Sequence, residues 1–271
     1  MSLPAPAGGF AALVTGASSG IGAAIADELA ARGHAVVLVA RRLERLQSLA
    51  LELAAEHGIT AHPLSCDLGD AEQRARLPEQ LRQLGLEVDV LVNNAGFATG
   101  GPFHESDPDR ELQQVRLDVE AVVALTAEFV RGMVSRHRGA VLNVASTAGM
   151  QPLPYSAGYS AAKAYVLTFS EALHTELRPH GVTVTALAPG PVSTEFWEIA
   201  NWKVSGQSFE SAIPRQAWIT AKQAARAGVE GLESGSRVVV PGLPMRAAML
   251  ASRYIPNAVK LPSIAIALRR R

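Results

Sequence analysis

The stretch "TGASSGIG", residues 15–22, follows the short apolar run "FAALVTG" (10–16) and precedes "AAIADELAARG" (23–33), which has helical periodicity. A glycine-rich turn between a strand and a helix lets the backbone turn tightly and approach a ligand closely. The helix N-terminus behind it offers free N–H groups and the positive end of the helix dipole to a pyrophosphate. The stretch therefore predicts the first βα unit of a dinucleotide-binding fold; the alternative is a tight turn without a ligand.

The same alternation of strand and helix patterns continues along the chain. Further apolar, strand-like runs occupy 34–40, 59–65, 88–94, 140–146, 182–188 and 237–242. Helical patterns separate most of them, which predicts βαβ units and a parallel sheet. The runs are apolar throughout, as expected when both faces of a sheet are buried. We expect an α/β fold: one Rossmann-type doubly wound domain over residues 1–271, with a seven-stranded parallel sheet and helices on both faces.

The composition narrows the function classes. The formal net charge is zero, so the chain lacks the basic balance that a nucleic-acid partner favours. Cys66 is the single cysteine, which excludes an internal disulfide and fits a reducing compartment. The N-terminus does not resemble a signal peptide, and no apolar run reaches the roughly 20 residues that cross a bilayer. We expect a cytoplasmic protein without a nucleic-acid partner.

Two regions interrupt the strand–helix rhythm. Residues 190–218 form a long connection that holds five of the 14 aromatic residues, Phe196, Trp197, Trp202, Phe209 and Trp218. Aromatic side chains bury large apolar area, so this segment is interpreted as a lid over an apolar substrate, or as packing on its own domain or a subunit. The tail, 243–271, mixes apolar and basic residues, and no acidic residue follows Glu233. Such a tail can lie on an anionic membrane, but we expect a terminal helix packed on the subunit or a partner.

The second predicted strand ends in "VARR" (39–42), where the adenosine ribose lies in dinucleotide-binding sheets. An acidic residue there would bind the 2′-hydroxyl of NAD. Arg41 and Arg42 can instead pair with the 2′-phosphate of NADP. We therefore expect NADP(H); the alternative is that these arginines begin a solvated helix face.

The motifs together resemble those of the short-chain dehydrogenase/reductase family over residues 10–242. In the family's order they are the glycine-rich turn at 15–22, "NNAG" at 93–96, Ser146, Tyr159-x-x-x-Lys163 and "PGPVST" at 189–194. The spacing of 13 residues from Ser146 to Tyr159 also matches the family. The resemblance implies an oxidoreductase that transfers hydride between NADP(H) and a carbonyl or alcohol.

The resemblance also implies which residues bind the cofactor. Besides Arg41 and Arg42, these are Gly16, Ser18, Ser19, Gly20, Ile21, Gly22, Asp67, Leu68, Asn93, Ala95, Gly96, Tyr159, Lys163, Pro189, Gly190, Val192 and Thr194. Asp67 would hold the adenine amine, and Val192 and Thr194 the nicotinamide carboxamide. Asp67 and Asp70 leave a second interpretation open, because either could cap the helix that starts in "DLGDAEQ".

The catalytic residues implied by the resemblance are Ser146, Tyr159 and Lys163. Tyr159 and Lys163 are four residues apart, so on a helix they share one face. Tyr159 would act as general acid in reduction and as general base in oxidation. A free tyrosine has a pKa near 10, and we expect the cations of Lys163 and the oxidised nicotinamide to favour its phenolate. Lys163 would also bind the nicotinamide ribose, and Ser146 would donate to the substrate oxygen.

Asp118 departs from the family pattern. The stretch "DVEAVVALT" (118–126) places it where the family has an asparagine that holds a helix kink and a water leading to the lysine. An ionised aspartate accepts hydrogen bonds but donates none. We expect Asp118 to pair with Lys163 through water and to alter the proton relay and its pH dependence; the alternative is neutral drift.

Other candidate sites are weak. We expect no metal site, because His57 and His62 lack a plausible third ligand nearby, and we expect Cys66 to be a small buried residue. The helices predicted over 107–136 and 157–180 would form the family's subunit contacts, so we expect a homodimer or homotetramer. The sequence favours an NADP(H)-dependent carbonyl reductase or alcohol dehydrogenase. The alternatives are a 3-oxoacyl thioester reductase and a non-catalytic NADP-sensing protein.

Overall fold

The computed structural model describes residues 3–200, 203–204, 207–208, 215–252 and 254–268. Seven strands form one sheet in the order β11-β6-β5-β4-β1-β2-β3, and every pair of neighbours is parallel. They are β1 (Phe10–Thr15), β2 (Val36–Ala40), β3 (Ala61–Ser65), β4 (Glu87–Asn93), β5 (Gly139–Val144), β6 (Val182–Leu187) and β11 (Val238–Val239). The predicted seven-stranded parallel sheet is confirmed.

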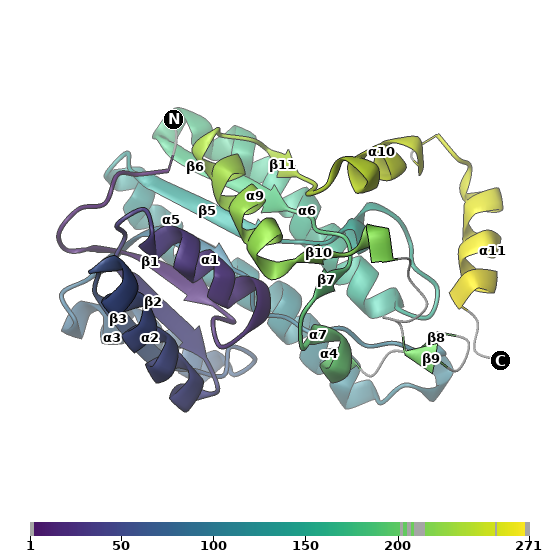
Figure 1. Ribbon diagram of the computed structural model, residues 1–271, viewed down its shortest axis with the longest axis horizontal. Coiled ribbons are helices and arrows are strands. Elements are labelled where there is room, and N and C mark those ends of the chain that lie inside the picture. The colour runs from purple at the N-terminus through teal and green to yellow at the C-terminus, as the bar shows by residue number, and fades with distance from the viewer. Residues whose placement is uncertain (1–2, 201–202, 205–206, 209–214, 253, 269–271) are drawn as a thin grey trace.

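Helices cover both faces of the sheet. One face carries α1 (Gly20–Ala30), α2 (Leu43–His57) and α9 (Ala221–Glu233). The other carries α3 (Ala71–Gln83), α5 (Ala121–Ser135) and α6 (Ala157–Leu177). In Figure 1, α1 and α9 lie in front of the sheet and α5 and α6 behind it. A shorter helix, α4 (Pro108–Val115), leads into α5 through a π-helical turn, η2 (Arg116–Glu120).

The strands supply side chains to both hydrophobic cores. Val14 and Leu38 pack with α1, α2 and α9, whereas their neighbours Leu13 and Val37 pack with α3, α5 and α6. Successive side chains of a strand point to opposite faces, so a strand buried on both sides needs apolar residues at every position. This explains why the strands appear in the sequence as continuous apolar runs.

The strand order reverses between β1 and β4, since β2 and β3 follow on one side and β5, β6 and β11 on the other. Ligands of doubly wound sheets bind at the carboxyl ends of the strands, at such a reversal. The turns after β1, β4, β5 and β6 therefore meet at one edge of the sheet. These turns hold most of the predicted site residues.

The predicted lid and tail form small elements beyond this edge. The lid contains β7 (Val192–Ser193), α7 (Phe196–Ala200), β8 (Lys203–Val204) and β9 (Gln207–Ser208), and β10 (Ile219–Thr220) follows it directly. β10 pairs in parallel with β7. The tail forms α10 (Leu243–Ser252) and α11 (Asn257–Leu268), which extend from one end of the molecule in Figure 1. Within the described part of the chain, each helix is too short or too polar to cross a membrane.

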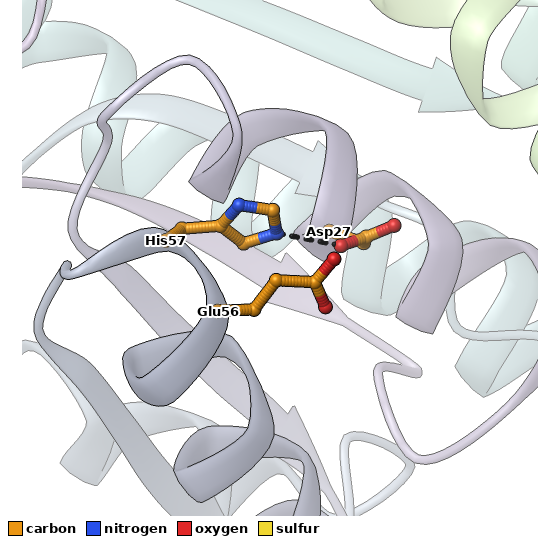
Figure 2. A group of neighbouring side chains, drawn as sticks. All are labelled: Asp27, Glu56 and His57. Atoms are coloured by element: carbon orange, nitrogen blue, oxygen red, sulfur yellow. Dashed lines mark hydrogen bonds and ion pairs between the residues drawn. The ribbon is translucent and has the colours of Figure 1, made fainter.

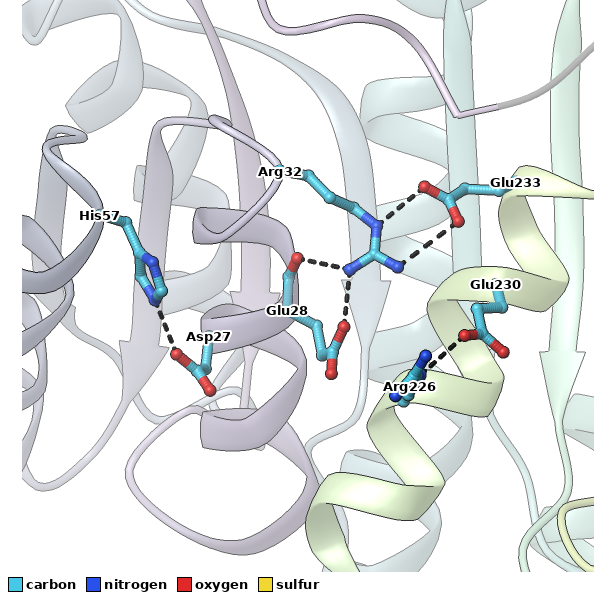
Figure 3. Close-up of polar contacts among 7 residues, drawn as sticks. All are labelled: Asp27, Glu28, Arg32, His57, Arg226, Glu230 and Glu233. Atoms are coloured by element: carbon cyan, nitrogen blue, oxygen red, sulfur yellow. Dashed lines mark hydrogen bonds and ion pairs between the residues drawn. The ribbon is translucent and has the colours of Figure 1, made fainter.

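Polar contacts tie α1 to its two neighbouring helices. Arg32, just after α1, binds Glu28 of α1 at 2.6 Å and Glu233 of α9 at 2.8 Å. His57, the last residue of α2, lies 2.8 Å from Asp27 of α1. Figure 3 shows both contacts, which join three helices on one face of the sheet.

Candidate active site

A cavity of about 420 Å³ opens at the carboxyl edge of the sheet. Many of the predicted cofactor and catalytic residues line it: Gly16, Ser19, Gly20, Ile21, Ala95, Gly96, Ser146, Tyr159, Lys163, Pro189, Gly190, Val192 and Thr194. Four turns that are distant in the sequence thus supply one cavity wall each. Ser18, Gly22, Arg41, Arg42, Asp67, Leu68, Asn93 and Asp118 lie outside this lining.

The glycine-rich turn at 15–22 packs closely against the protein on one side and borders the cavity on the other. Gly16 has φ +65°, and a Cβ there would lie 2.7 Å from the Asn94 amide nitrogen. A Cβ on Gly22 would lie 2.4 Å from the carbonyl oxygen of Gly16. Real Cβ atoms do not come so close, so both positions require glycine. Gly20, with φ +60°, faces Thr194 across the cavity mouth.

Asn94 fixes the turn, a role that the sequence motif did not indicate. Its side-chain amide donates to the carbonyls of Thr15 at 2.9 Å and Gly16 at 3.3 Å, and it lines the cavity. Its neighbour Asn93 points into the sheet interior, where it donates to Thr126 and Asn143. The motif "NNAG" therefore divides its two asparagines between the cavity wall and the core.

Arg42 lies beside the glycine turn, in the place predicted for the NADP 2′-phosphate. Its guanidinium donates to the hydroxyls of Ser18 at 2.9 Å and Ser19 at 2.8 Å. A cation flanked by two hydroxyls fits a phosphate monoester. Arg41 is exposed. The geometry therefore favours Arg42 over Arg41 as the phosphate ligand.

The two aspartates after β3 have separate roles. Asp70 caps α3, since its carboxylate accepts from the backbone N–H groups of Glu72 at 2.8 Å and Gln73 at 3.2 Å. Asp67 accepts from the Gly69 N–H at 2.9 Å. The helix cap is thus provided by Asp70, which leaves Asp67 for the predicted adenine contact. Leu68, between them in sequence, is buried.

Ser146, Tyr159 and Lys163 meet on one cavity wall. Tyr159 and Lys163 share the first turns of α6, and the Lys163 ammonium lies 5.6 Å from the centroid of the Tyr159 ring. The ammonium donates to the carbonyl of Val144 at 3.2 Å, which anchors it to the end of β5. Ser146 begins the next turn and accepts from the Ala148 N–H at 3.1 Å. All three side chains are largely buried.

The surroundings of Tyr159 set its protonation. Burial raises the pKa of the phenol, the positive charge of Lys163 lowers it, and the negative charge of Asp118 raises it again. Lys163 thus acts in the predicted direction, but burial outweighs it and the pKa stays above its ordinary value. The tyrosine is therefore protonated at neutral pH and ready to donate a proton.

Asp118 contacts Lys163 directly. Its carboxylate lies 3.3 Å from the Lys163 ammonium and also accepts from the Phe97 N–H at 3.1 Å. The expectation of a water between Asp118 and Lys163 is wrong, because η2 places the carboxylate within ion-pair distance. Gly96 makes room for it, since a Cβ there would lie 2.8 Å from the Asp118 carboxylate.

The ion pair keeps the lysine charged. Burial on its own lowers the pKa of Lys163, but the Asp118 carboxylate and the Tyr159 phenol outweigh burial, so this pKa is raised. Burial raises the pKa of Asp118 more than the charge of Lys163 lowers it, so this pKa is raised as well. Asp118 is 0 % exposed, so water cannot solvate its carboxylate. Lys163 is the cation that compensates the charge of this carboxylate.

The lid supplies an aromatic wall opposite the catalytic residues. Phe196 lies 5.7 Å from the Tyr159 ring, and Trp197 packs edge-on against Phe196 at 5.2 Å. Trp218 packs on Trp197 at 5.7 Å. Phe196 and Trp197 line the cavity, while Trp202 and Phe209 fall outside the described residues.

The tail also reaches the cavity, a contribution that the sequence did not reveal. Met245 and Met249 of α10 and Ile264 of α11 line it. The two methionines are four residues apart, so they share one face of α10. The tail thus packs on its own subunit, one of the two alternatives, and closes the apolar side of the cavity.

Comparison with known families identifies the chain. The model of the family described as short chain dehydrogenase matches residues 11–203. The chain belongs to the short-chain dehydrogenases. It is therefore an oxidoreductase of a family that acts on alcohol and carbonyl groups.

Several relatives of this short-chain dehydrogenase are named as reductases or dehydrogenases. The very-long-chain 3-oxoacyl-CoA reductase of Anas platyrhynchos is 35% identical over 242 residues, 87% of this chain and 73% of that protein. The 17-beta-hydroxysteroid dehydrogenase type 3 of Rattus norvegicus is 38% identical over 192 residues, 70% of this chain and 62% of that protein. The match thus spans less than two thirds of the rat enzyme.

Solved structures show the same architecture. A short-chain dehydrogenase from Sphingobium yanoikuyae in complex with NADPH is 32% identical, with a TM-score of 0.79 over 90% of this chain and 92% of that one. L-sorbose reductase from Gluconobacter frateurii, complexed with NADPH and L-sorbose, is 28% identical, with a TM-score of 0.76 over 89% and 97%. The doubly wound fold of this short-chain dehydrogenase is therefore shared.

Among the residues that the structure describes, one group of potential metal ligands lies outside the cavity. Asp27, Glu56 and His57 bring ligand atoms within 4.8 Å of one another (Figure 2). The expectation that His57 lacks such neighbours is wrong, because α1 and α2 pack side by side. The Asp27–His57 contact accounts for this group as a link between helices. Cys66 is buried as predicted, and burial raises the pKa of its thiol to about 11, which makes it a poor nucleophile.

Proposed function

We propose that this short-chain dehydrogenase reduces an apolar ketone or aldehyde with NADPH, and catalyses the reverse oxidation with NADP. The observation that carries the proposal is the meeting of Ser146, Tyr159 and Lys163 on one wall of a cavity. The glycine turn borders that cavity on one side and an apolar lid and tail border it on the other. Arg42 with its two serine neighbours fits the 2′-phosphate, which supports NADP(H) over NAD(H).

The mechanism assigns one role to each catalytic side chain. NADPH, when bound, supplies the hydride. Tyr159 donates the proton to the substrate oxygen, and its raised pKa keeps that proton in place until negative charge develops. Ser146 donates a hydrogen bond to the same oxygen. The Lys163 ammonium then stabilises the phenolate that remains.

Asp118 acts through Lys163 and is a positioning residue. It holds the ammonium beside the phenol and keeps it charged. The carboxylate of Asp118, the ammonium of Lys163 and the phenol of Tyr159 thus lie next to one another in this order.

The substrate is bound by apolar contact in this proposal. Phe196, Trp197, Met245 and Met249 face the catalytic wall, and aromatic and thioether groups adapt to bulky apolar molecules. A 3-oxoacyl thioester is the second candidate substrate. It is favoured by the name of the Anas platyrhynchos relative together with this apolar lining.

Assembly as a homodimer or homotetramer is part of the proposal. Leu112 and Val115 of α4 and Tyr165 of α6 are exposed large apolar side chains on the helices predicted to form subunit contacts. Light scattering coupled to gel filtration measures the mass. We also propose a cytoplasmic location, which the single buried cysteine supports.

A substrate panel tests the proposed reaction. NADPH consumption is followed with apolar ketones, aldehydes and 3-oxoacyl thioesters, and NADPH binding is measured on the same sample. We expect turnover with at least one bulky apolar ketone. Tight NADPH binding without turnover across the panel would favour the alternative of an NADP-sensing protein.

A further inference from the structure

The guanidinium of Arg42 hydrogen-bonds to the glycine turn on one side and to the lid on the other. On the turn side, its Nη2 donates to the hydroxyls of Ser18 and Ser19. On the lid side, its Nη1 donates to the carboxylate of Glu195 at 2.9 Å. The group predicted to bind the 2′-phosphate of the cofactor therefore already binds an anion of the protein.

Glu195 is shared between two arginines. Its carboxylate accepts from Arg42 and also from Arg45 of α2, at 2.7 and 2.9 Å. The hydrogen bonds from Arg42 and then Arg45 lower the pKa of Glu195, so it is ionised at neutral pH. A carboxylate held by two guanidiniums is the arrangement that these groups would also offer a phosphate.

The backbone explains how Glu195 reaches this position. Thr194 lies against the glycine turn, where a Cβ on Gly20 would meet its methyl carbon at 3.2 Å. Glu195 is the next residue and precedes α7 directly. The Glu195 side chain thus reaches from the lid to the start of α2. In doubly wound sheets the adenosine ribose of the cofactor binds beside this part of the chain.

We propose that Glu195 sets the cofactor preference of this enzyme by competing with the 2′-phosphate of NADP(H) for Arg42 and Arg45. The 2′-phosphate must displace the carboxylate or share the two arginines with it. NAD(H) carries no phosphate there and does not compete. Glu195 therefore weakens NADP(H) binding selectively. This inference rests on the proposed use of NADP(H).

The test is a set of dissociation constants for NADPH and NADH, measured by quenching of tryptophan fluorescence without substrate. The variants are Glu195→Gln, which keeps the shape of the side chain, and Glu198→Gln as the matched control on the exposed side of α7. We expect Glu195→Gln to lower the Kd for NADPH about tenfold, which corresponds to about 1.4 kcal/mol. The Kd for NADH stays unchanged, and Glu198→Gln changes neither.

A second variant pair shows whether the effect passes through Arg42. In an Arg42→Ala background, Glu195→Gln is expected to change NADPH affinity much less than in wild type. An unchanged or raised Kd for NADPH in Glu195→Gln overturns the inference, as does an equal change for NADPH and NADH. Wild-type protein that binds neither nucleotide would instead overturn the proposed function itself.

Discussion

Lys163 lies between a phenol and a carboxylate, and its charge acts on both. Burial removes most of the water that would screen these groups, so each charge strongly affects its neighbours. The carboxylate of Asp118 raises the pKa of Lys163 and adds to the rise in the pKa of Tyr159. The family's asparagine would bring no such charge. Asp118 should therefore be visible in the pH dependence of the reaction.

Asp118→Asn is expected to shift the pH profile of alcohol oxidation to lower pH. Oxidation needs the Tyr159 phenolate, so its rate rises as pH passes through the pKa of Tyr159. Removing the negative charge of Asp118 lowers that pKa, because one of the groups that raise it is lost. It also lowers the pKa of Lys163, so the alkaline limit moves down as well. The measurement is kcat/KM for alcohol oxidation as a function of pH.

Asn keeps the acceptor for the Phe97 N–H, so the fold around η2 should survive the change. Circular dichroism and NADPH affinity serve as controls. Superimposable profiles for wild type and Asp118→Asn would show that the carboxylate has no electrostatic role.

The residue types of this site could be predicted, but not all of their contacts. The order and spacing of the motifs located Ser146, Tyr159 and Lys163. The direct contact between Asp118 and Lys163 depends on η2, a one-turn irregularity that no spacing rule predicts. The role of Asn94 could not be predicted either, because the sequence does not indicate which of two adjacent asparagines faces the cavity.

At the scale of elements, the tail helix α10 completes the substrate cavity. Met245 and Met249 line the cavity, whereas Leu250, the next residue, is exposed. One short helix thus offers both a cavity-facing and an outward-facing apolar side chain. The comparison of the two separates a binding effect from a general loss of helix stability.

Met249→Ala is expected to raise KM for a bulky apolar ketone about tenfold. The change removes apolar contact equal to roughly two methylene groups, worth about 1.5 kcal/mol. Leu250→Ala, the matched control, should leave KM within about twofold of wild type. The measurement is KM from steady-state kinetics with one bulky and one small ketone. An equal effect of the two variants on KM would contradict a cavity role for α10.

For the whole molecule, α1, which begins in the glycine turn, packs between α2 and α9. Arg32 links α1 to α9 with its side chain about a quarter exposed. Arg226 pairs with Glu230 of the same helix, α9, at 2.8 Å, with 70% of its side chain exposed. Arg32→Ala therefore removes a pair between helices together with the Glu28 pair of α1, whereas Arg226→Ala removes a pair within α9 (Figure 3).

Arg32→Ala is expected to lower the free energy of unfolding by about 1 kcal/mol and Tm by about 2–3 °C. Arg226→Ala should cost about 0.3 kcal/mol or less, because exposed pairs one turn apart contribute little. Thermal and urea unfolding measure both variants. Equal losses would mean that the link between α1 and α9 adds nothing to stability.

The fold could be predicted because apolar runs and glycine-containing turns alternate regularly along the chain. Every predicted strand was found, although the last shrank to Val238–Val239. The sequence could not predict which part of the tail contacts the cavity. Apolar residues occur along the whole tail, and only its packing determines which of them line the cavity. The Asp27–His57 contact was missed for a related reason, because it joins two helices that the sequence describes separately.

In the proposed mechanism, Tyr159 transfers the proton in NADPH-dependent carbonyl reduction. The most direct test is Tyr159→Phe, measured for NADPH affinity and for turnover of the best ketone on the same sample. We predict that kcat falls at least about a hundredfold while the Kd for NADPH changes less than about threefold, because general acid catalysis contributes factors of that size. Turnover near the wild-type rate with intact binding would contradict the assignment of Tyr159.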